Sequence, residues 1–129
     1  MSTMVPYYEP AAEKAKELTK GCTSQLMKYR IITEYVTRCF RYDYVRAILI
    51  PKKNGKPDVP RTWEKRMGIC LDIASMTTGM LRAVCIKANM CTGKADGKNH
   101  AWVEAKVAGQ KYIYDHDGKA KTYVTQYRY

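Results

Sequence analysis

The sequence predicts an α+β fold in which N-terminal helices and a central cysteine-bearing helix pack on an antiparallel sheet. Apolar residues recur at helical spacing up to about residue 84, and beyond it apolar and polar residues alternate as in half-buried strands. The 129 residues fit a single domain, 1–129, because a domain typically has ~100–200 residues. The composition, 46% hydrophobic and 27% charged, is typical of a globular chain and argues against a disordered one.

Two helices are expected in the first 41 residues. Segment 9–21 has Pro10 in its first turn, acidic residues early, lysines late and Gly21 as a stop signal. Thr23 or Ser24 then caps a second helix that ends near Arg41. Its apolar stripe consists of Tyr29, Ile32, Val36, Cys39 and Phe40. Residues 51–60, with three prolines and an Asn-Gly step, are expected to form a loop.

The third helix is expected to run from about Cys70 to about Val84. Its apolar stripe comprises Ile73, Met76, Met80, Leu81 and Val84. Cys70 therefore lies in the first turn, directly after Gly68-Ile69, which we expect to be a flexible pair.

The remaining residues predict an antiparallel meander. A short strand, 88–92, closes at Gly93, and residues 93–99 form a polar loop. Segment 100–107 alternates, with small apolar residues on one face and His100, Trp102, Glu104 and Lys106 on the other. Turns at 108–110 and 116–119 then lead into strands 111–115 and 122–129, and the Tyr-rich last strand is a candidate edge that pairs with another chain.

The net charge of +11 first suggests an anionic partner. However, residues 1–64 carry 12 basic and 7 acidic side chains and residues 65–129 carry 11 and 5, so the excess is evenly spread. This distribution argues against a specific nucleic-acid site and leaves an anionic surface polymer or an acidic substrate as alternatives. No apolar run approaches the ~20 residues of a membrane-spanning helix. No secretory signal is visible, so a secreted or cell-surface protein whose signal has been removed and a cytoplasmic protein both fit.

The chain has five cysteines, an odd number, so at least one thiol is free or bonded to another chain. None of them forms a Cys-x-x-Cys pair, which argues against a structural zinc site. We therefore expect neither a metal nor another cofactor.

Three residues form a candidate catalytic set. Cys70 at a helix N-terminus meets unpaired backbone N–H groups and the positive end of the helix dipole, which favour thiolate, the nucleophilic form. His100 and Asp115 lie on two strands joined by one tight hairpin, so with a small stagger they become neighbours. Singly, these residues are more often a core cysteine, a surface histidine and a turn aspartate. Jointly, they fit a nucleophile, a base and the group that orients the base.

The segment MGICLDIASMTTGMLRAVCIKANMCTG, followed by HAWVEAKVAGQKYIYDHD, resembles the papain-like core of the transglutaminase-like superfamily, in a small bacterial-type form. The resemblance implies that Cys70 is the nucleophile, His100 the general base and acid, and Asp115 its orienting partner. The chain departs from the family at Cys85-Ile86-Lys87, where relatives commonly have Gly-Ile-Pro, and at Tyr112, where many have Trp. We expect strain if Cys85 is left-handed. The acidic clusters of calcium-dependent members are not visible.

The resemblance implies acyl transfer through a thioester, with a peptide or protein as the substrate. We expect hydrolysis of peptide or amide bonds, with glutamine–amine crosslinking as one alternative. Another alternative, from a different class, is a non-catalytic basic module that binds an anionic cell-surface polymer. Tyr42 and Trp63 are candidate side-chain donors to the oxyanion, and Trp102 either walls the acyl pocket or packs in the core.

Overall fold

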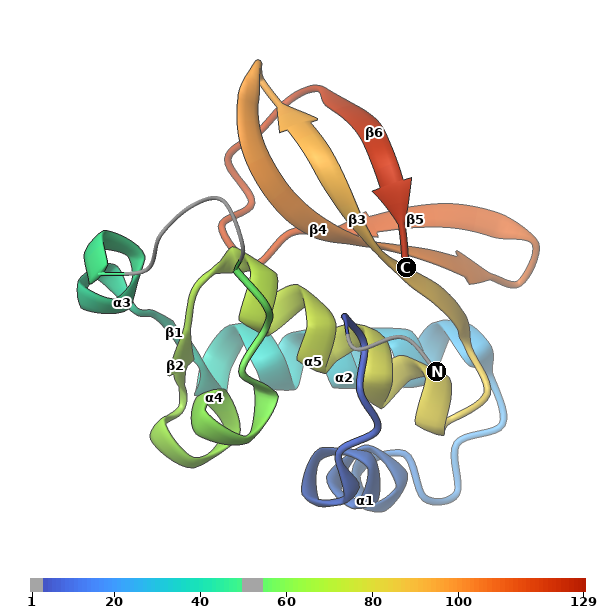
Figure 1. The fold of residues 1–129 in the computed structure, drawn as a ribbon. Helices are drawn as coiled ribbons and strands as arrows, with labels where there is room; N and C mark the ends of the chain where they lie inside the picture. The colour runs from blue at the N-terminus through green and yellow to red at the C-terminus, as the bar shows by residue number, and fades with distance from the viewer. Residues whose placement is uncertain (1–3, 50–54) are drawn as a thin grey trace.

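The structure, a computed structural model, describes residues 4–49 and 55–129 and confirms the α+β class. The helices are α1 (Glu9–Leu18), α2 (Gln25–Cys39), α3 (Tyr44–Leu49), α4 (Val59–Lys65) and α5 (Cys70–Ala83). The strands are β1 (Arg41–Tyr42), β2 (Met67–Gly68), β3 (Lys87–Ala95), β4 (Lys98–Val107), β5 (Gln110–Tyr114) and β6 (Tyr123–Arg128). Figure 1 shows the four-stranded sheet above a layer of helices.

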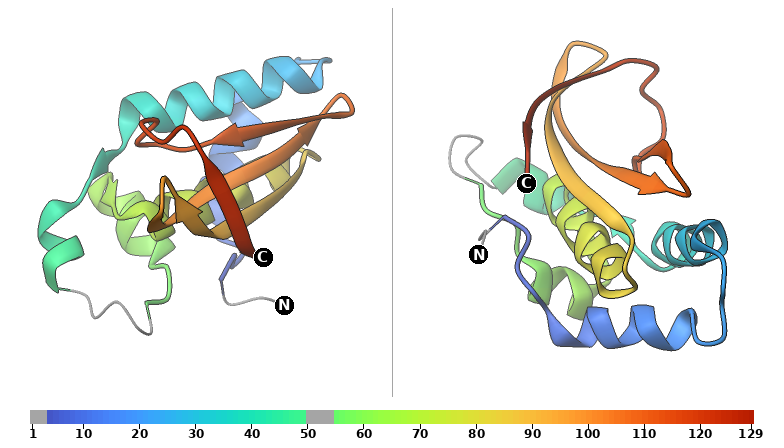
Figure 2. Two further views of the ribbon diagram at one scale, coloured as in Figure 1. Left: turned by 90° about the horizontal axis from the view of Figure 1, so that it is seen from above. Right: turned by 90° about the vertical axis from the view of Figure 1, so that its right-hand side faces the viewer.

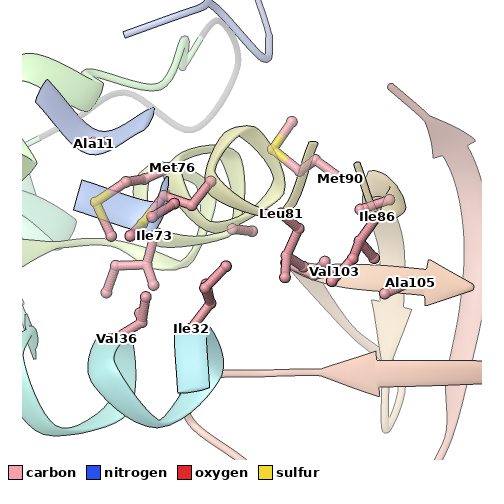
Figure 3. Close-up of a cluster of buried hydrophobic side chains, with 14 of the residues drawn as sticks. Ala11, Ile32, Val36, Ile73, Met76, Leu81, Ile86, Met90, Val103 and Ala105 are labelled. Carbon is pink, nitrogen blue, oxygen red and sulfur yellow. The ribbon is translucent and has the colours of Figure 1, made fainter. Parts of the chain in front are cut away.

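Helix α5 is the centre of the molecule, because it lies between the sheet and α1 (Figures 1 and 2). The core between α5, α2 and the sheet includes Ile73, Leu81, Ile32 and Val103 (Figure 3). Since α5 is covered on several sides, even its hydroxyl-bearing residues are buried. Thr77 Oγ1 donates to the Ile73 carbonyl at 2.7 Å within the helix, whereas Ser75 Oγ donates to the Met4 carbonyl at 2.7 Å.

The three predicted helices are confirmed. α1 has Pro10 in its first turn, and the Ser24 hydroxyl caps α2 by accepting from the Met27 N–H at 3.3 Å. α2 ends at Cys39, earlier than predicted, because Arg41 and Tyr42 pair as strand β1. Cys39 is exposed and does not belong to the buried stripe of α2.

The region between α2 and α5 was poorly predicted. Residues 51–54 of the expected loop 51–60 lie outside the described residues, and the end of the predicted loop is wrong because α4 begins at Val59. Asp58 caps this helix by accepting from the Arg61 N–H at 3.1 Å. The expected flexibility of Gly68 is also wrong, because this residue pairs with Tyr42 in the parallel β1–β2 ladder.

The sheet has the strand order β5-β4-β3-β6, with all neighbours antiparallel. The predicted loop 93–99 is wrong, because β3 continues to Ala95 and a two-residue turn, Asp96-Gly97, leads into β4. Both turn residues have positive φ, 49° and 80°, the conformation that an Asp-Gly hairpin favours.

The predicted meander is wrong at its last strand, because β6 pairs with β3 instead of β5. The Asp96 carboxylate holds the returning segment by accepting from the N–H groups of Lys121 and Thr122 at 3.0 and 2.8 Å. β6 also approaches β3 so closely that a Cβ on Gly93 would lie 2.1 Å from the Val124 carbonyl oxygen. The pairing therefore requires glycine at position 93.

We expect the substitution Gly93→Ala to lower the free energy of unfolding by about 3 kcal/mol, because the new methyl group would overlap backbone atoms of β6. Gly79→Ala is the matched control. A Cβ there would lie 3.8 Å from its nearest atom, within a helix, so we expect stabilisation by about 0.5–1 kcal/mol. Denaturant unfolding measures both. A Gly93→Ala protein as stable as the wild type would mean that β6 does not pair with β3 in this way.

Candidate active site

Cys70 is the first residue of α5, and its side chain is partly buried. The preceding residue, Ile69, is extended, with φ −86° and ψ 173°, so the chain enters the helix abruptly at the cysteine. The first backbone N–H groups of a helix have no intrahelical partners, and the helix dipole is positive at this end. Cys70 therefore lies where an anion is stabilised.

Gly68 allows the strand before Cys70 to pack closely against α4. A Cβ at this position would lie 2.8 Å from Thr62 Oγ1 and 2.9 Å from the Asp72 Cβ. The Gly68 carbonyl accepts from the Asp43 N–H at 2.9 Å, which joins the strand to the end of β1. The glycine two residues before the cysteine is thus required by packing.

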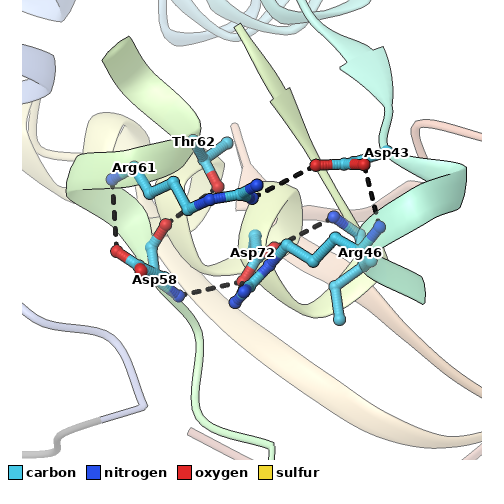
Figure 4. Close-up of polar contacts among 7 residues, drawn as sticks. Asp43, Arg46, Asp58, Arg61, Thr62 and Asp72 are labelled. Atoms are coloured by element: carbon cyan, nitrogen blue, oxygen red, sulfur yellow. Dashed lines mark hydrogen bonds and ion pairs between the residues drawn. The ribbon is translucent and has the colours of Figure 1, made fainter. Parts of the chain in front are cut away.

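A buried carboxylate, Asp72, lies in the first turn of α5 (Figure 4). It accepts from the N–H groups of Ile69 at 3.0 Å and Asp58 at 2.9 Å. It also accepts from Arg46 Nε at 2.8 Å and Nη2 at 3.2 Å. This one side chain therefore joins the start of α5 to α3 and to the residue that caps α4.

A second carboxylate, Asp43, completes the group of polar contacts in Figure 4. It accepts from the Arg46 N–H at 3.0 Å and from Arg61 Nη1 at 3.1 Å. The hydrogen bond from the Arg46 backbone is the largest cause that lowers the pKa of Asp43. Sequence reasoning missed this network. Asp72 in a first helical turn was a local signal, but Arg46 lies 26 residues away and nothing in the sequence pairs the two.

The structure brings His100 and Asp115 together. His100 Nε2 lies 2.9 and 3.0 Å from the two carboxylate oxygens of Asp115. The β4–β5 register pairs Val103 with Tyr114, so Asp115 follows directly after β5 and becomes a diagonal neighbour of His100. His116 ties this segment to the helices, because its Nε2 donates to the Phe40 carbonyl at 2.9 Å.

The electrostatics of these residues favour an imidazolium at His100. Hydrogen bonds to Asp115 and then to Cys70 raise the pKa of His100 from 6.5 to about 10. Burial raises the pKa of Asp115, but hydrogen bonds from His100 and Tyr123 outweigh it, so the net shift is downward. Because the Asp115 carboxylate engages Nε2, the other ring nitrogen of His100, Nδ1, is left for the thiol.

Tyr123, which sequence reasoning missed, donates its hydroxyl proton to Asp115 Oδ2 at 3.0 Å. Tyr123 also contacts Trp102, with ring centroids 4.9 Å apart, and the Trp102 ring lies 6.4 Å from His100. Trp102 is 1% exposed, which favours packing in the core, the second of the two roles considered for it. Tyr123 covers Trp102 because β6 pairs with β3. The predicted meander, in which the last strand follows β5, does not bring these two residues together.

The structure places the two candidate oxyanion donors differently. Tyr42 pairs with Gly68, two residues before Cys70, and burial followed by the charge of Cys70 raises the pKa of its phenol. Trp63 instead packs on Phe40, with ring centroids 5.8 Å apart, and beneath the Arg66 guanidinium at 4.2 Å. Among the residues that the structure describes, Trp63 has no recorded contact with the Cys70–His100 pair, so its assignment to the site is not supported.

All five cysteines are free thiols in the described parts of the chain. Cys39 and Cys85 are exposed, whereas Cys91 is buried, and burial raises the pKa of its thiol to about 11. Cys85, which stands where relatives commonly have Gly, has a left-handed φ of 67°, the conformation for which strain was expected. Within residues 4–49 and 55–129, no three His, Cys, Asp or Glu side chains gather as a metal site requires, and no helix could cross a membrane.

Comparisons with known proteins identify the fold and the family. A sequence profile described as the transglutaminase-like superfamily matches residues 12–115. Among solved structures, a proposed cysteine protease from Cytophaga hutchinsonii matches with a TM-score of 0.72 and 22% identity, over 92% of this chain and 40% of that one. A proposed protease from Parabacteroides distasonis matches with a TM-score of 0.66 and 18% identity, over 83% of this chain and 23% of that one.

A third structure, of a protein named TGase, matches with a TM-score of 0.63 and 18% identity, over 92% of this chain and 32% of that one. The chain thus spans less than half the length of each of these three proteins. A search of curated proteins found no match.

We expect the imidazole of His100 to titrate near pH 10, and Asp115→Asn to return its pKa toward 6.5, because Asp115 is the largest cause of the shift. The imidazole carbon–proton signals in NMR spectra measure this, with His116→Gln to assign the two histidines.

A raised pKa stabilises the fold fully below pH 6.5, and this contribution is lost as the pH rises through about 10. The unfolding free energy should therefore fall across that interval in the wild type and less in Asp115→Asn. Titration of wild-type His100 near 6.5 would contradict the geometry.

Proposed function

Because the chain belongs to the transglutaminase-like superfamily, we propose that it is an enzyme that transfers acyl groups through the thiol of Cys70. The observation that carries the proposal is the position of His100, whose Nε2 lies 2.9 Å from the Asp115 carboxylate and whose ring is near enough to Cys70 for that thiol to raise its pKa. A cysteine at a helix start, an imidazole beside it and a carboxylate that orients the imidazole are the parts that thiol catalysis needs.

In the first step, the Cys70 thiolate attacks the carbonyl carbon of an amide. The C–S bond forms and the carbonyl electron pair moves onto oxygen. We assign the stabilisation of this oxyanion to the backbone N–H groups in the first turn of α5. Tyr42 is the side-chain donor we assign to it, since its raised phenol pKa keeps the O–H proton in place and its strand pairs with Gly68.

In the second step, the C–N bond breaks and the protonated His100 gives its proton to the leaving amine. A thioester between the acyl group and Cys70 remains. Neutral His100 then takes a proton from water, whose oxygen attacks the thioester carbon and releases a carboxylic acid and the Cys70 thiolate. Asp115 keeps the ring oriented through both steps, and Tyr123 and the Asp117 N–H, at 3.0 and 3.2 Å, hold Asp115.

We propose hydrolysis of peptide or amide bonds as the overall reaction. Two of the matched structures carry protease names, which supports hydrolysis. The structure named TGase favours a second candidate, in which a primary amine replaces water and crosslinks a glutamine side chain. The two differ only in what resolves the thioester. A non-catalytic basic module that binds an anionic polymer needs none of the contacts of His100, so we place it third.

We expect the wild type to release ammonia from benzyloxycarbonyl-glutaminyl-glycine, or to cleave casein, without incorporating monodansylcadaverine. Cys70→Ala should lower this turnover by at least about 10³-fold, because the nucleophile is gone. Ammonia release, peptide cleavage and dansyl fluorescence bound to product are the measurements, and Cys85→Ala, which removes an exposed thiol outside the site, is the control.

Incorporation of the amine would identify the transferase instead of the hydrolase. Turnover retained in Cys70→Ala would show that Cys70 is not the nucleophile.

A further inference from the structure

Helix α3 exposes its apolar side chains and turns its charged side chain inward. Tyr44, Val45, Ile48 and Leu49 point to solvent and are 66–82% exposed. Positions three and four apart lie on one side of a helix, so these four side chains form a continuous surface, which we call the α3 apolar face. The charged residue of the helix, Arg46, points inward, with its side chain 14% exposed.

The α3 apolar face differs from the other exposed hydrophobic side chains. Tyr7, Met27 and Ile113 lie singly in separate segments, and β6 carries two exposed hydrophobic residues, Val124 and Tyr127. Single residues and pairs of this kind are normal on a protein surface. Four large apolar residues within six positions form a patch, and contiguous exposed apolar patches mark interaction sites.

The anchor of α3 connects this face to the proposed nucleophile. The helix has no buried residue and is held by Arg46, which donates to Asp72 in the first turn of α5. The Tyr44 ring lies 4.9 Å from that of Tyr42, whose strand pairs with Gly68 just before Cys70. Figures 1 and 2 show α3 projecting from the body at the end of the molecule where α5 begins.

The size of the face argues against a second copy of the chain as its occupant. The four partly exposed side chains could bury at most roughly 500 Å² of surface against a partner. This estimate takes ~150–250 Å² as the area that a large aromatic side chain buries, and less for an aliphatic one. A stable protein–protein interface buries about 800 Å² on each partner. A short extended peptide that reaches Cys70 needs only a few apolar contacts of this kind.

We propose that the α3 apolar face binds hydrophobic side chains of the acyl-donor substrate, on a peptide or protein segment adjoining the reactive carbonyl. This inference rests on the proposed function and adds the substrate class. The preferred substrates carry bulky aliphatic or aromatic residues next to the bond that reacts. The buried pair Arg46–Asp72 holds this face in a fixed position relative to Cys70.

The test uses two chloromethyl ketones with the same reactive group, N-acetyl-Leu-Leu and N-acetyl-Gly-Gly, and iodoacetamide as a reagent without a recognition element. The rate of modification of Cys70 is followed by peptide mass mapping. In the wild type we expect the Leu-Leu reagent to react about tenfold faster than the Gly-Gly reagent.

The variant Ile48→Ser/Leu49→Ser should lose this preference and keep the wild-type rates with Gly-Gly and iodoacetamide. Tyr7→Ser/Met27→Ser, which removes two other exposed hydrophobics, should keep it.

The proposed role of the α3 apolar face is overturned if the wild type reacts equally fast with the two peptide reagents. It is also overturned if Ile48→Ser/Leu49→Ser keeps the preference for the Leu-Leu reagent. A dimer that light scattering detects in the wild type but not in this variant, with the preference unchanged, would assign the face to a second copy. A different result would show that the proposed function itself is wrong: iodoacetamide would then modify Cys70 no faster than the exposed Cys39 and Cys85.

Discussion

The arrangement of the candidate site depends on the buried carboxylate of Asp72. A buried charge is costly unless it is paired and hydrogen-bonded, and this one accepts from two backbone N–H groups and two atoms of Arg46. Those four bonds join the first turn of α5, the residue before α4, and α3. The bond to the Ile69 N–H holds the residue before Cys70, and the bonds to Arg46 hold the inward side of α3, so that the α3 apolar face points outward.

The site also lies where the helical layer meets the four-stranded sheet. Cys70 comes from the helices, whereas His100 and Asp115 come from the sheet. The small apolar residues of β4 pack on α5, and the bond from His116 to the Phe40 carbonyl joins the segment after β5 to the end of α2. Behind His100, Trp102 of β4 packs against Tyr123 of β6 across the intervening strand β3. Packing on both sides therefore fixes the position of the imidazole relative to the start of α5.

Local signals in the sequence predicted α1, α2, α5, β4 and β5, because helical spacing, caps and alternation act over a few residues. They also predicted that a hairpin brings His100 and Asp115 together. The misses are non-local. The pairing of β6 with β3 depends on a close approach to Gly93, and the Arg46–Asp72 pair joins residues 26 positions apart. Tyr123 could be assigned to Asp115 only once β6 had been placed beside β3. α3 was missed because its outward apolar face reverses the usual pattern of a helix.

The central claim is that position, and not accessibility, makes Cys70 the reactive thiol. Its most direct measurement is the rate at which iodoacetamide modifies each of the five cysteines at pH 6, read by peptide mass mapping. Exposure alone ranks Cys39 and Cys85 above the partly buried Cys70. We predict the opposite order, with Cys70 fastest and its advantage lost in His100→Gln. Rates that follow exposure, with Cys70 no faster than the other thiols, would contradict the account.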